Sequence, residues 1–341
     1  MKRCLALVLI LGMAAGAARA QHARPNPEET LRASVDPRIP AYKPIAGLKG
    51  ELRGVESDTM YYVAKLWIDD FTKLYPSVSI HVVPSGSHTA GPGLADGSAD
   101  FGLVAREMLP KEEAAFTGKF RYKPLGIAIS GGSWRIKAYT DANAFFVNGR
   151  NPLKQITMAQ LDAIYSKTRR RGYPRDIATW GQLGLKGAWA DKPIHLWGVK
   201  VPNGFEHFLQ ERVLEGGEWR DDIQTRDTVI PLPAMVAADP YAIGYSGYSW
   251  LTPGVRPLAV ADTPAGPYYA CTFANVASQK YPLSRVLYVF VNKRPGKPLD
   301  PVLREFIRFL LSRQGQQDVV KDGIFTPLPL SFIAKAEAKL R

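Results

Sequence analysis

Two short stretches of the sequence place hydroxyl side chains where a helix is expected to begin. The stretches are GVESDTM, residues 54–60, and PSGSHTA, residues 84–90, and their candidate binding residues are Ser57, Asp58, Thr59, Ser85, Ser87, His88 and Thr89. At a helix start, unpaired backbone N–H groups and the positive end of the helix dipole converge with such short donors. This combination suits an anion, so both stretches are candidate loops of one site. Ser87 or Thr89 could instead cap its own helix, and His88 could face water.

Further candidates lie in DFGLVAREM, residues 100–108, and in GVKVPNGF, residues 198–205. Arg106 ends an apolar strand pattern beside the hydroxyl loops, where it could contact the ligand or pair with Glu107 or Asp100. The later stretch adds Lys200, Asn203 and Gly204. An amide and free backbone N–H groups at the start of the following helix could hold an anion from a second side. Lys200 could equally be solvated.

The hydroxyl loops are each expected to join a strand to a helix. Residues 77–83, SVSIHVV, alternate as a strand does, and ELRGV precedes the first loop. Apolar residues recur at helical spacing from Asp58 to about Tyr75, which predicts a helix with one buried face. Further along, WRIKAYT, residues 134–140, has strand-like content. Strands that alternate with helices in this way predict an α/β fold.

These motifs resemble a known family. SDTM before a helix, GSHTA and DGSADFGLVAREM are similar to the phosphate-binding loops of PstS-type periplasmic solute-binding proteins. The resemblance continues through AIGYSG, residues 242–247, and through residues 281–323, and it covers most of the chain from about Gly50. It implies a type 2 periplasmic binding protein fold, in which two lobes, each a mixed sheet flanked by helices, enclose a ligand cleft.

The sequence departs from the family pattern at three places. The family has an Arg and a Ser-Gly-Thr that grip the anion from the second lobe, where this chain has Val199, Lys200, Asn203 and Phe205. Ala105 precedes Arg106 where the family has a Ser, and His88 stands where a small residue is common. Because a Lys offers one mobile point charge in place of the planar guanidinium fork, we expect weaker phosphate binding than in a typical member.

The chain is expected to divide into four parts. Residues 1–20 read as a secretory signal with Lys2 and Arg3, an apolar run and an Ala18-Arg19-Ala20 cleavage site. Residues 21–48 are rich in Pro and charge and predict an extended N-terminal arm. We assign 49–141 and 262–341 to the first lobe and 142–261 to the second, with a hinge near 141–145 and 246–262.

Charge and cysteine content narrow the function classes. The formal net charge of +13 becomes 13 − 3 = +10 once the signal, with Lys2, Arg3 and Arg19, is removed. A basic secreted protein attracts anions, but the dispersed Lys and Arg and the lack of an aromatic-basic motif do not indicate nucleic acid. No later apolar run approaches membrane length, and only Cys271 remains in the mature chain, so no internal disulfide is expected.

The sequence does not match the common catalytic motifs of enzymes. The sequence has no G-x-S-x-G elbow and no H-E-x-x-H or paired-cysteine spacing for zinc. Ser87 and His88 with Asp58 nearby could suggest nucleophilic catalysis, but adjacent residues in a loop rarely point at each other. We therefore expect neither a catalytic residue nor a cofactor.

These observations and the resemblance together predict a periplasmic receptor that captures phosphate or a related small oxyanion. The resemblance implies an inner-membrane ABC transporter permease as partner, and we expect a monomer that binds no nucleic acid and does not insert into a membrane. Two alternatives stay open: a phosphatase-like enzyme on the same fold, or a non-transport binding or scaffolding protein with an altered ligand site.

Overall fold

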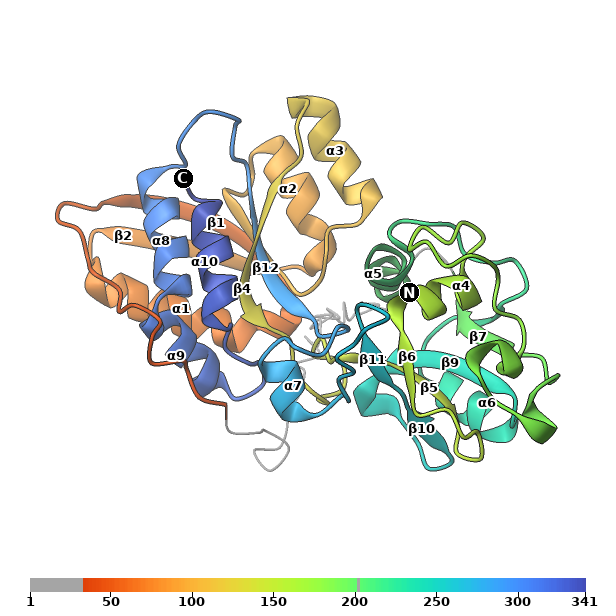
Figure 1. The fold of residues 1–341 in the computed structure, drawn as a ribbon. Coiled ribbons are helices and arrows are strands. Elements are labelled where there is room, and N and C mark those ends of the chain that lie inside the picture. Colours follow the sequence, from red (N-terminus) through yellow and green to blue (C-terminus); the bar gives the residue numbers. More distant parts are fainter. Residues whose placement is uncertain (1–32, 201–202) are drawn as a thin grey trace, which may run out of the picture.

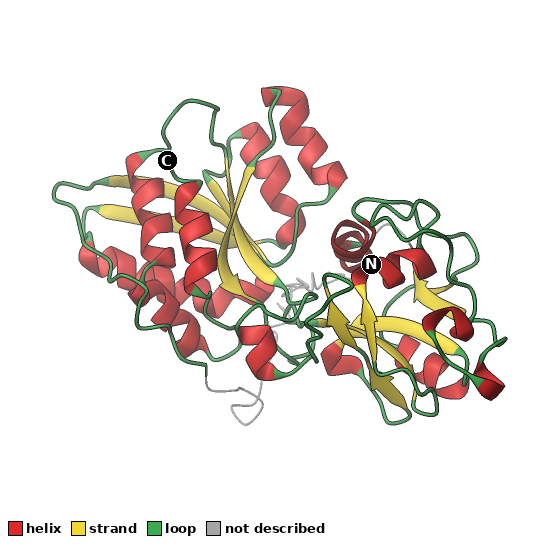
Figure 2. Cartoon of the chain, in the orientation of Figure 1, coloured by secondary structure: helices red, strands yellow, loops and turns green. Residues whose placement is uncertain are grey.

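The computed structural model describes residues 33–200 and 203–341 and folds into two lobes side by side (Figure 1). Each lobe has a mixed β-sheet with helices packed on it (Figure 2), as the sequence predicts for an α/β protein. The predicted signal at 1–20 and the first part of the predicted arm lie outside the described residues. The part of the arm at 33–48 has no helix or strand, and it packs Ile39 and Tyr42 into the first lobe.

The first lobe is built on a five-stranded sheet. Its strands, in spatial order, are β2 (Val78–Pro84), β1 (Gly50–Glu56), β3 (Phe101–Val104), β12 (Val286–Val291) and β4 (Leu125–Gly131). β1 runs parallel to both β2 and β3, whereas β12 is antiparallel to β3 and β4. The carboxyl ends of three adjacent parallel strands therefore meet at one edge of the sheet, which is where α/β sheets commonly bind ligands.

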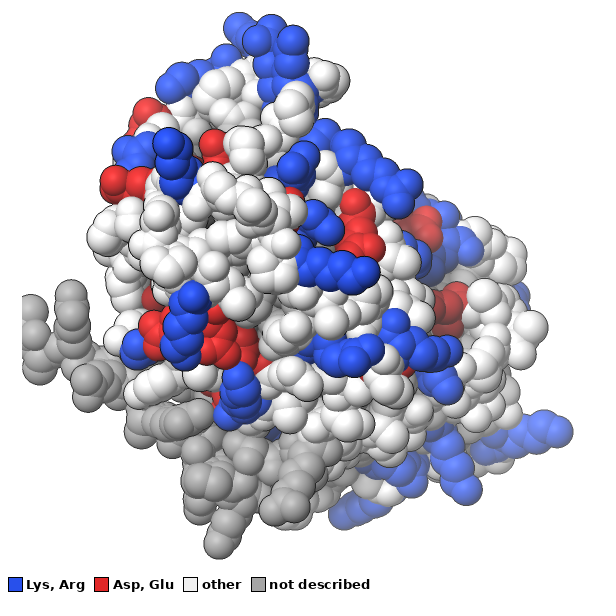
Figure 3. Space-filling view, turned by 90° about the vertical axis from the view of Figure 1, so that its left-hand side faces the viewer, with Lys and Arg blue, Asp and Glu red and all other residues white. Residues whose placement is uncertain are grey.

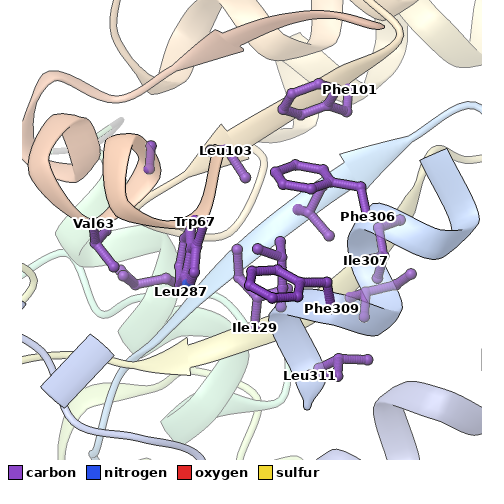
Figure 4. Close-up of a cluster of buried hydrophobic side chains, with 14 of the residues drawn as sticks. Val63, Trp67, Phe101, Leu103, Ile129, Leu287, Phe306, Ile307, Phe309 and Leu311 are labelled. Atoms are coloured by element: carbon purple, nitrogen blue, oxygen red, sulfur yellow. The ribbon is translucent and has the colours of Figure 1, made fainter. Parts of the chain in front are cut away.

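Helices cover both faces of this sheet. They are α1 (Tyr61–Leu74), α2 (Ala90–Asp96), α3 (Pro110–Phe120), α8 (Pro301–Leu311), α9 (Arg313–Asp322) and α10 (Leu330–Ala338). The larger core joins β-strand residues to α1 and α8, where Trp67, Phe306 and Phe309 are almost fully buried (Figure 4). A smaller cluster on the other face joins Leu94 of α2 to Phe116 of α3. Because buried side chains pack on both faces of the sheet, the position of the sheet edge that carries the loops after β1, β2 and β3 is held by the core.

The second lobe repeats this plan with other connections. Its main sheet has the order β10 (Val255–Pro257), β5 (Asn143–Asn148), β9 (Ala242–Gly247), β7 (His195–Val199) and β8 (Gln224–Arg226). A small sheet pairs β11 (Ala259–Ala261) with β6 (Gln155–Thr157), and the helices are α4 (Met158–Tyr165), α5 (Gly204–Leu214), α6 (Leu232–Ala238) and α7 (Phe273–Ala277). β7, β8 and β9 are mutually parallel, and α5 follows β7 on the side of the lobe that faces α2 and α3 (Figure 1).

The chain crosses between the lobes near Asp141. The Asp141 carboxylate accepts hydrogen bonds from the backbone N–H and the hydroxyl of Ser249, at 2.9 and 2.6 Å, so it ties the segment that enters the second lobe to the turn after β9. The strand predicted at 134–140 is wrong. Ala138 and Thr140 have φ of 67° and 52°, and Thr140 donates its hydroxyl to the carbonyl of Ala105 at 2.9 Å. Tertiary contacts have overridden the β-propensity of this stretch.

The second core cluster reaches beyond the predicted end of the second lobe at residue 261. It includes Cys271, Val276, Tyr281 and Leu283, and α7 lies between the lobes (Figure 1). The division into 49–141 with 262–341 and 142–261 stays a prediction.

The surface of the first lobe carries scattered charge. On the face shown in Figure 3, Lys and Arg are spread over the lobe and acidic side chains lie between them. Over residues 33–200 and 203–341, no helix combines the length and the apolar character that a membrane span requires.

Candidate functional site

The hydroxyl loops lie at the carboxyl ends of β1 and β2, next to β3. Ser57 directly follows β1 and donates its backbone N–H to Leu103 of β3 at 2.9 Å. Ser85 and Gly86 follow β2 and donate their N–H groups to the carbonyl of Glu56 at 3.1 and 3.0 Å. These bonds bring together two loops that are about thirty residues apart in sequence, as the parallel pairing of the strands requires.

The loop hydroxyls bond to one another and not to the helices that they precede. The Ser57 and Thr59 hydroxyls are 3.1 Å apart, those of Ser85 and Thr89 are 2.8 Å apart, and neither Ser57 nor Thr89 makes a side-chain cap. Ser87 accepts the backbone N–H of Ala105 at 3.2 Å. The alternative that Ser87 or Thr89 merely caps its helix is therefore not what the geometry favours. Asp58 and His88 are exposed at the margin of this hydroxyl cluster.

The Arg106 side chain is hydrogen-bonded to the neighbouring helix α3. Its guanidinium donates to both carboxylate oxygens of Glu112 on α3, at 2.8 and 2.6 Å, and to the carbonyl of Glu107 at 2.8 Å. Burial opposes the charge on Glu112, but the bonds from Arg106 hold the pKa of this carboxyl below its usual range. The sequence allowed Arg106 either to contact the ligand or to pair with Glu107 or Asp100. In the structure Arg106 pairs with an acidic side chain, and this partner is Glu112. Asp100 instead pairs with Arg53.

Across from Arg106 stands the start of α5. Asn203 caps this helix, since its side-chain oxygen accepts from the N–H groups of Phe205 and Glu206 at 3.0 and 2.9 Å. Gly204 lies against Arg106 of the first lobe, where an added Cβ would stand 2.7 Å from Cδ. The two halves of the predicted site therefore meet at Arg106 and Gly204. Lys200 is not brought to this contact, because it is exposed and paired with Asp227 at 3.0 Å.

Two buried carboxyl groups were missed by sequence reasoning. Glu56 ends β1 and Glu206 lies in the first turn of α5, and both are 2–3% exposed with one carboxyl oxygen unpartnered. Burial raises the pKa of Glu56 to about 7, with help from the charge of Asp58. Burial raises the pKa of Glu206 to about 8, although a hydrogen bond to Tyr245 works against the shift.

A sequence signal for both groups existed. Leu52, Gly54 and Glu56 alternate on the buried side of β1, and Glu206 precedes the buried Leu209 and Val213 of α5 by three and seven residues. The site thus joins hydroxyl donors and backbone amides to two carboxyl groups whose pKa values are raised by burial. Such a set can bind a tetrahedral oxyanion by hydrogen bonds. In the part of the chain that the structure describes, no cluster of His, Cys, Asp or Glu could hold a metal ion.

Comparisons with known proteins identify the family of the chain. The family model described as "PBP superfamily domain" matches residues 41–314. The phosphate-binding protein PstS of Pseudomonas aeruginosa is 37% identical over 340 residues, which cover 100% of this chain and 99% of that protein. Protein SphX of Synechocystis is 26% identical over 279 residues, with 80% and 77% covered.

Solved structures share the fold. PstS from Borrelia burgdorferi aligns with a TM-score of 0.53 at 18% identity, over 82% of this chain and 100% of that one. An ABC-type phosphate transport receptor from Vibrio cholerae aligns with a TM-score of 0.50 at 18% identity, over 81% and 99%. The two-lobed type 2 periplasmic binding protein fold is thereby confirmed, and the chain belongs to the PBP superfamily, in the family that includes PstS.

Proposed function

We propose that the protein is a substrate-binding receptor that captures phosphate or a related small oxyanion between its lobes and delivers it to an ABC transporter permease. The observation that carries the proposal is the meeting of the Ser57–Thr59 and Ser85–Thr89 hydroxyls at the carboxyl ends of adjacent parallel strands. These hydroxyls form no helix caps. Their bonds, including those of Thr89 to the carbonyl of Gly86 and of Ser85 to that of Val83, stay within the two loops and the end of β2, and a bound oxyanion would replace some of them. The full-length similarity to PstS of P. aeruginosa, a protein named for phosphate binding, supports phosphate as the ligand.

The proposed binding set is the hydroxyl cluster with the start of α5. Ser57, Thr59, Ser85, Ser87 and Thr89 would donate hydroxyls, and the Asp58 backbone N–H and the Gly204 end of α5 would add amide donors. His88 would stand at the margin. Arg106 and Asn203 would act by holding the surrounding elements, because their polar atoms are already bonded within the protein.

We also propose that the protein is not an enzyme. Hydrolysis of a phosphate ester by Ser87 would require a base beside its hydroxyl. The Ser87 hydroxyl instead accepts the N–H of Ala105, and His88 is exposed. Periplasmic location, a cleavable signal and a monomeric state complete the proposal, in line with a transport receptor.

The test compares wild-type protein with Thr59→Val and Thr89→Val combined, by calorimetric titration with phosphate. Valine keeps the shape of threonine and removes the hydroxyl, so the fold should persist while the affinity falls by about 10-fold or more. Thr117→Val is the matched control, because its hydroxyl bonds within α3, to the carbonyl of Glu113. Equal phosphate affinity in the double variant and the wild type would remove the hydroxyl loops from the site.

A further inference from the structure

Arg285, just before β12, lies where the two lobes touch. Its side chain is 6% exposed, and its guanidinium stands 4.2 Å from the ring centre of Phe208 on α5 of the second lobe. It also donates to the Glu107 carboxylate of the first lobe at 3.1 Å. An arginine in this place contacts both lobes at once.

The guanidinium of Arg285 has more donors than partners. A guanidinium carries five N–H donors in a planar fork. Within the described residues, the bond to Glu107 is the hydrogen bond that it makes, and its buried Nε has no partner. A buried donor without a partner is costly, so an acceptor that reached the Arg285 guanidinium from outside the chain would be bound favourably there. Arg106 differs, because its fork is filled by Glu112 and the carbonyl of Glu107.

The same short segment connects Arg285 to the hydroxyl cluster. The N–H of Ala105 donates to Ser87, and the carboxylate two residues later, on Glu107, holds Arg285. The charge of Arg285 also reaches Asp141 at the lobe crossing, where it partly offsets the burial that raises the pKa of this carboxyl. The Arg285 guanidinium thus lies at the contact between the lobes, and the segment from Ala105 to Glu107 links it to the hydroxyl of Ser87.

We propose that Arg285 binds the captured oxyanion and supplies the guanidinium of the site from the first lobe. Of the other cations considered for the site, Arg106 already makes three hydrogen bonds, to Glu112 and the carbonyl of Glu107, and Lys200 is exposed beside Asp227. Phe208 covers one face of the Arg285 guanidinium, so the unused N–H donors lie at the edge of the guanidinium plane. This inference rests on the proposed function, since it assigns a residue to the same site.

The test measures phosphate affinity by calorimetry for Arg285→Met, Phe208→Leu and Arg256→Met. Arg256 on β10 is the matched control, because its buried Nε is also unpartnered but β10 lies at the outer edge of the second sheet. Loss of a charge-assisted contact should weaken binding by about 10- to 100-fold in Arg285→Met. Arg256→Met should match the wild type, and Phe208→Leu should lose much less than Arg285→Met.

Four results would overturn the assignment. Wild-type affinity in Arg285→Met would remove Arg285 from the site, and an equal loss in Phe208→Leu would mean that Arg285 only bridges the lobes. If Arg285→Met does not fold, Arg285→Lys decides, since lysine keeps the charge toward Glu107 and lacks Nε and the planar fork. A loss of about tenfold in the lysine variant supports the proposal, and unchanged affinity contradicts it. Failure of the wild type itself to bind phosphate would contradict the proposed function as well.

Discussion

Gly204 of the second lobe lies so close to Arg106 of the first that a Cβ atom would stand 2.7 Å from Arg106 Cδ and 3.2 Å from Nε. Arg106 cannot easily retreat, because Glu112 and the carbonyl of Glu107 hold its guanidinium. The approach of the two lobes therefore depends on a residue without a side chain at the start of α5.

Gly204→Ala should hinder this approach. Crowding of a packed contact typically costs about 1–3 kcal/mol, so we expect phosphate affinity to fall by about tenfold or more. Small-angle scattering with saturating phosphate should give a larger radius of gyration than the wild type. Gly118→Ala on α3 is the control, because its Cβ would meet nothing within 4 Å. Equal radii for Gly204→Ala and wild type would show that the contact does not limit closure.

Glu112→Gln should destabilise the protein by about 1–3 kcal/mol at pH 7, because it breaks a charge-assisted pair that is 10–19% exposed. The folded-state pKa of Glu112 is depressed, so its contribution is present above the unfolded value near 4.5 and is lost as pH falls through the folded value. Urea denaturation should therefore show a gap between variant and wild type at pH 7 that narrows on acidification. A constant gap would contradict the assignment.

Glu56 and Glu206 should make the protein less stable as pH rises. Their folded pKa values, about 7 and about 8, lie above the ordinary value of 4.5, so the folded state binds the extra protons. Each group should lower the free energy of unfolding by up to about 1.4 kcal/mol per pH unit between pH 4.5 and its folded pKa. Denaturation of Glu56→Gln and Glu206→Gln at pH 6 and 8.5 should give flatter profiles. Slopes identical to the wild type would mean that neither carboxyl is held protonated.

Lys200→Ala should leave phosphate affinity within about twofold of the wild type. The Lys200 and Asp227 side chains are 66% and 83% exposed, and an ion pair of this kind contributes little. Titration at low and moderate salt checks this, because a cation at the mouth would steepen the salt dependence. A large loss of phosphate affinity in Lys200→Ala, seen at low salt alone, would show that Lys200 contributes to the binding site.

Much of the fold was predictable because it depends on local patterns. The S/T-x-x-E/Q spacing of a capping box is visible at Thr157 and Gln160, which form that box at the start of α4. An Asp followed by a Pro is typical of a helix start, and Asp300 with Pro301 begins α8. The hydroxyl loops were predictable for the same reason, since each follows a strand whose alternation is visible in the sequence.

The remaining features depend on contacts between distant residues. Arg285 bonds to Glu107, 178 residues away in the sequence. The stretch 134–140 has β-branched and aromatic residues but is bent by its bond to Ala105. Local propensity carries no information on such pairings.

The most direct test of the central claim is calorimetric titration of the mature wild-type protein with phosphate, arsenate and sulfate in turn. We expect saturable binding of phosphate at one site per chain, with competition by arsenate, which shares both the tetrahedral shape and the protonation behaviour of phosphate. Absence of saturable heat with all three oxyanions at millimolar concentration would contradict the account.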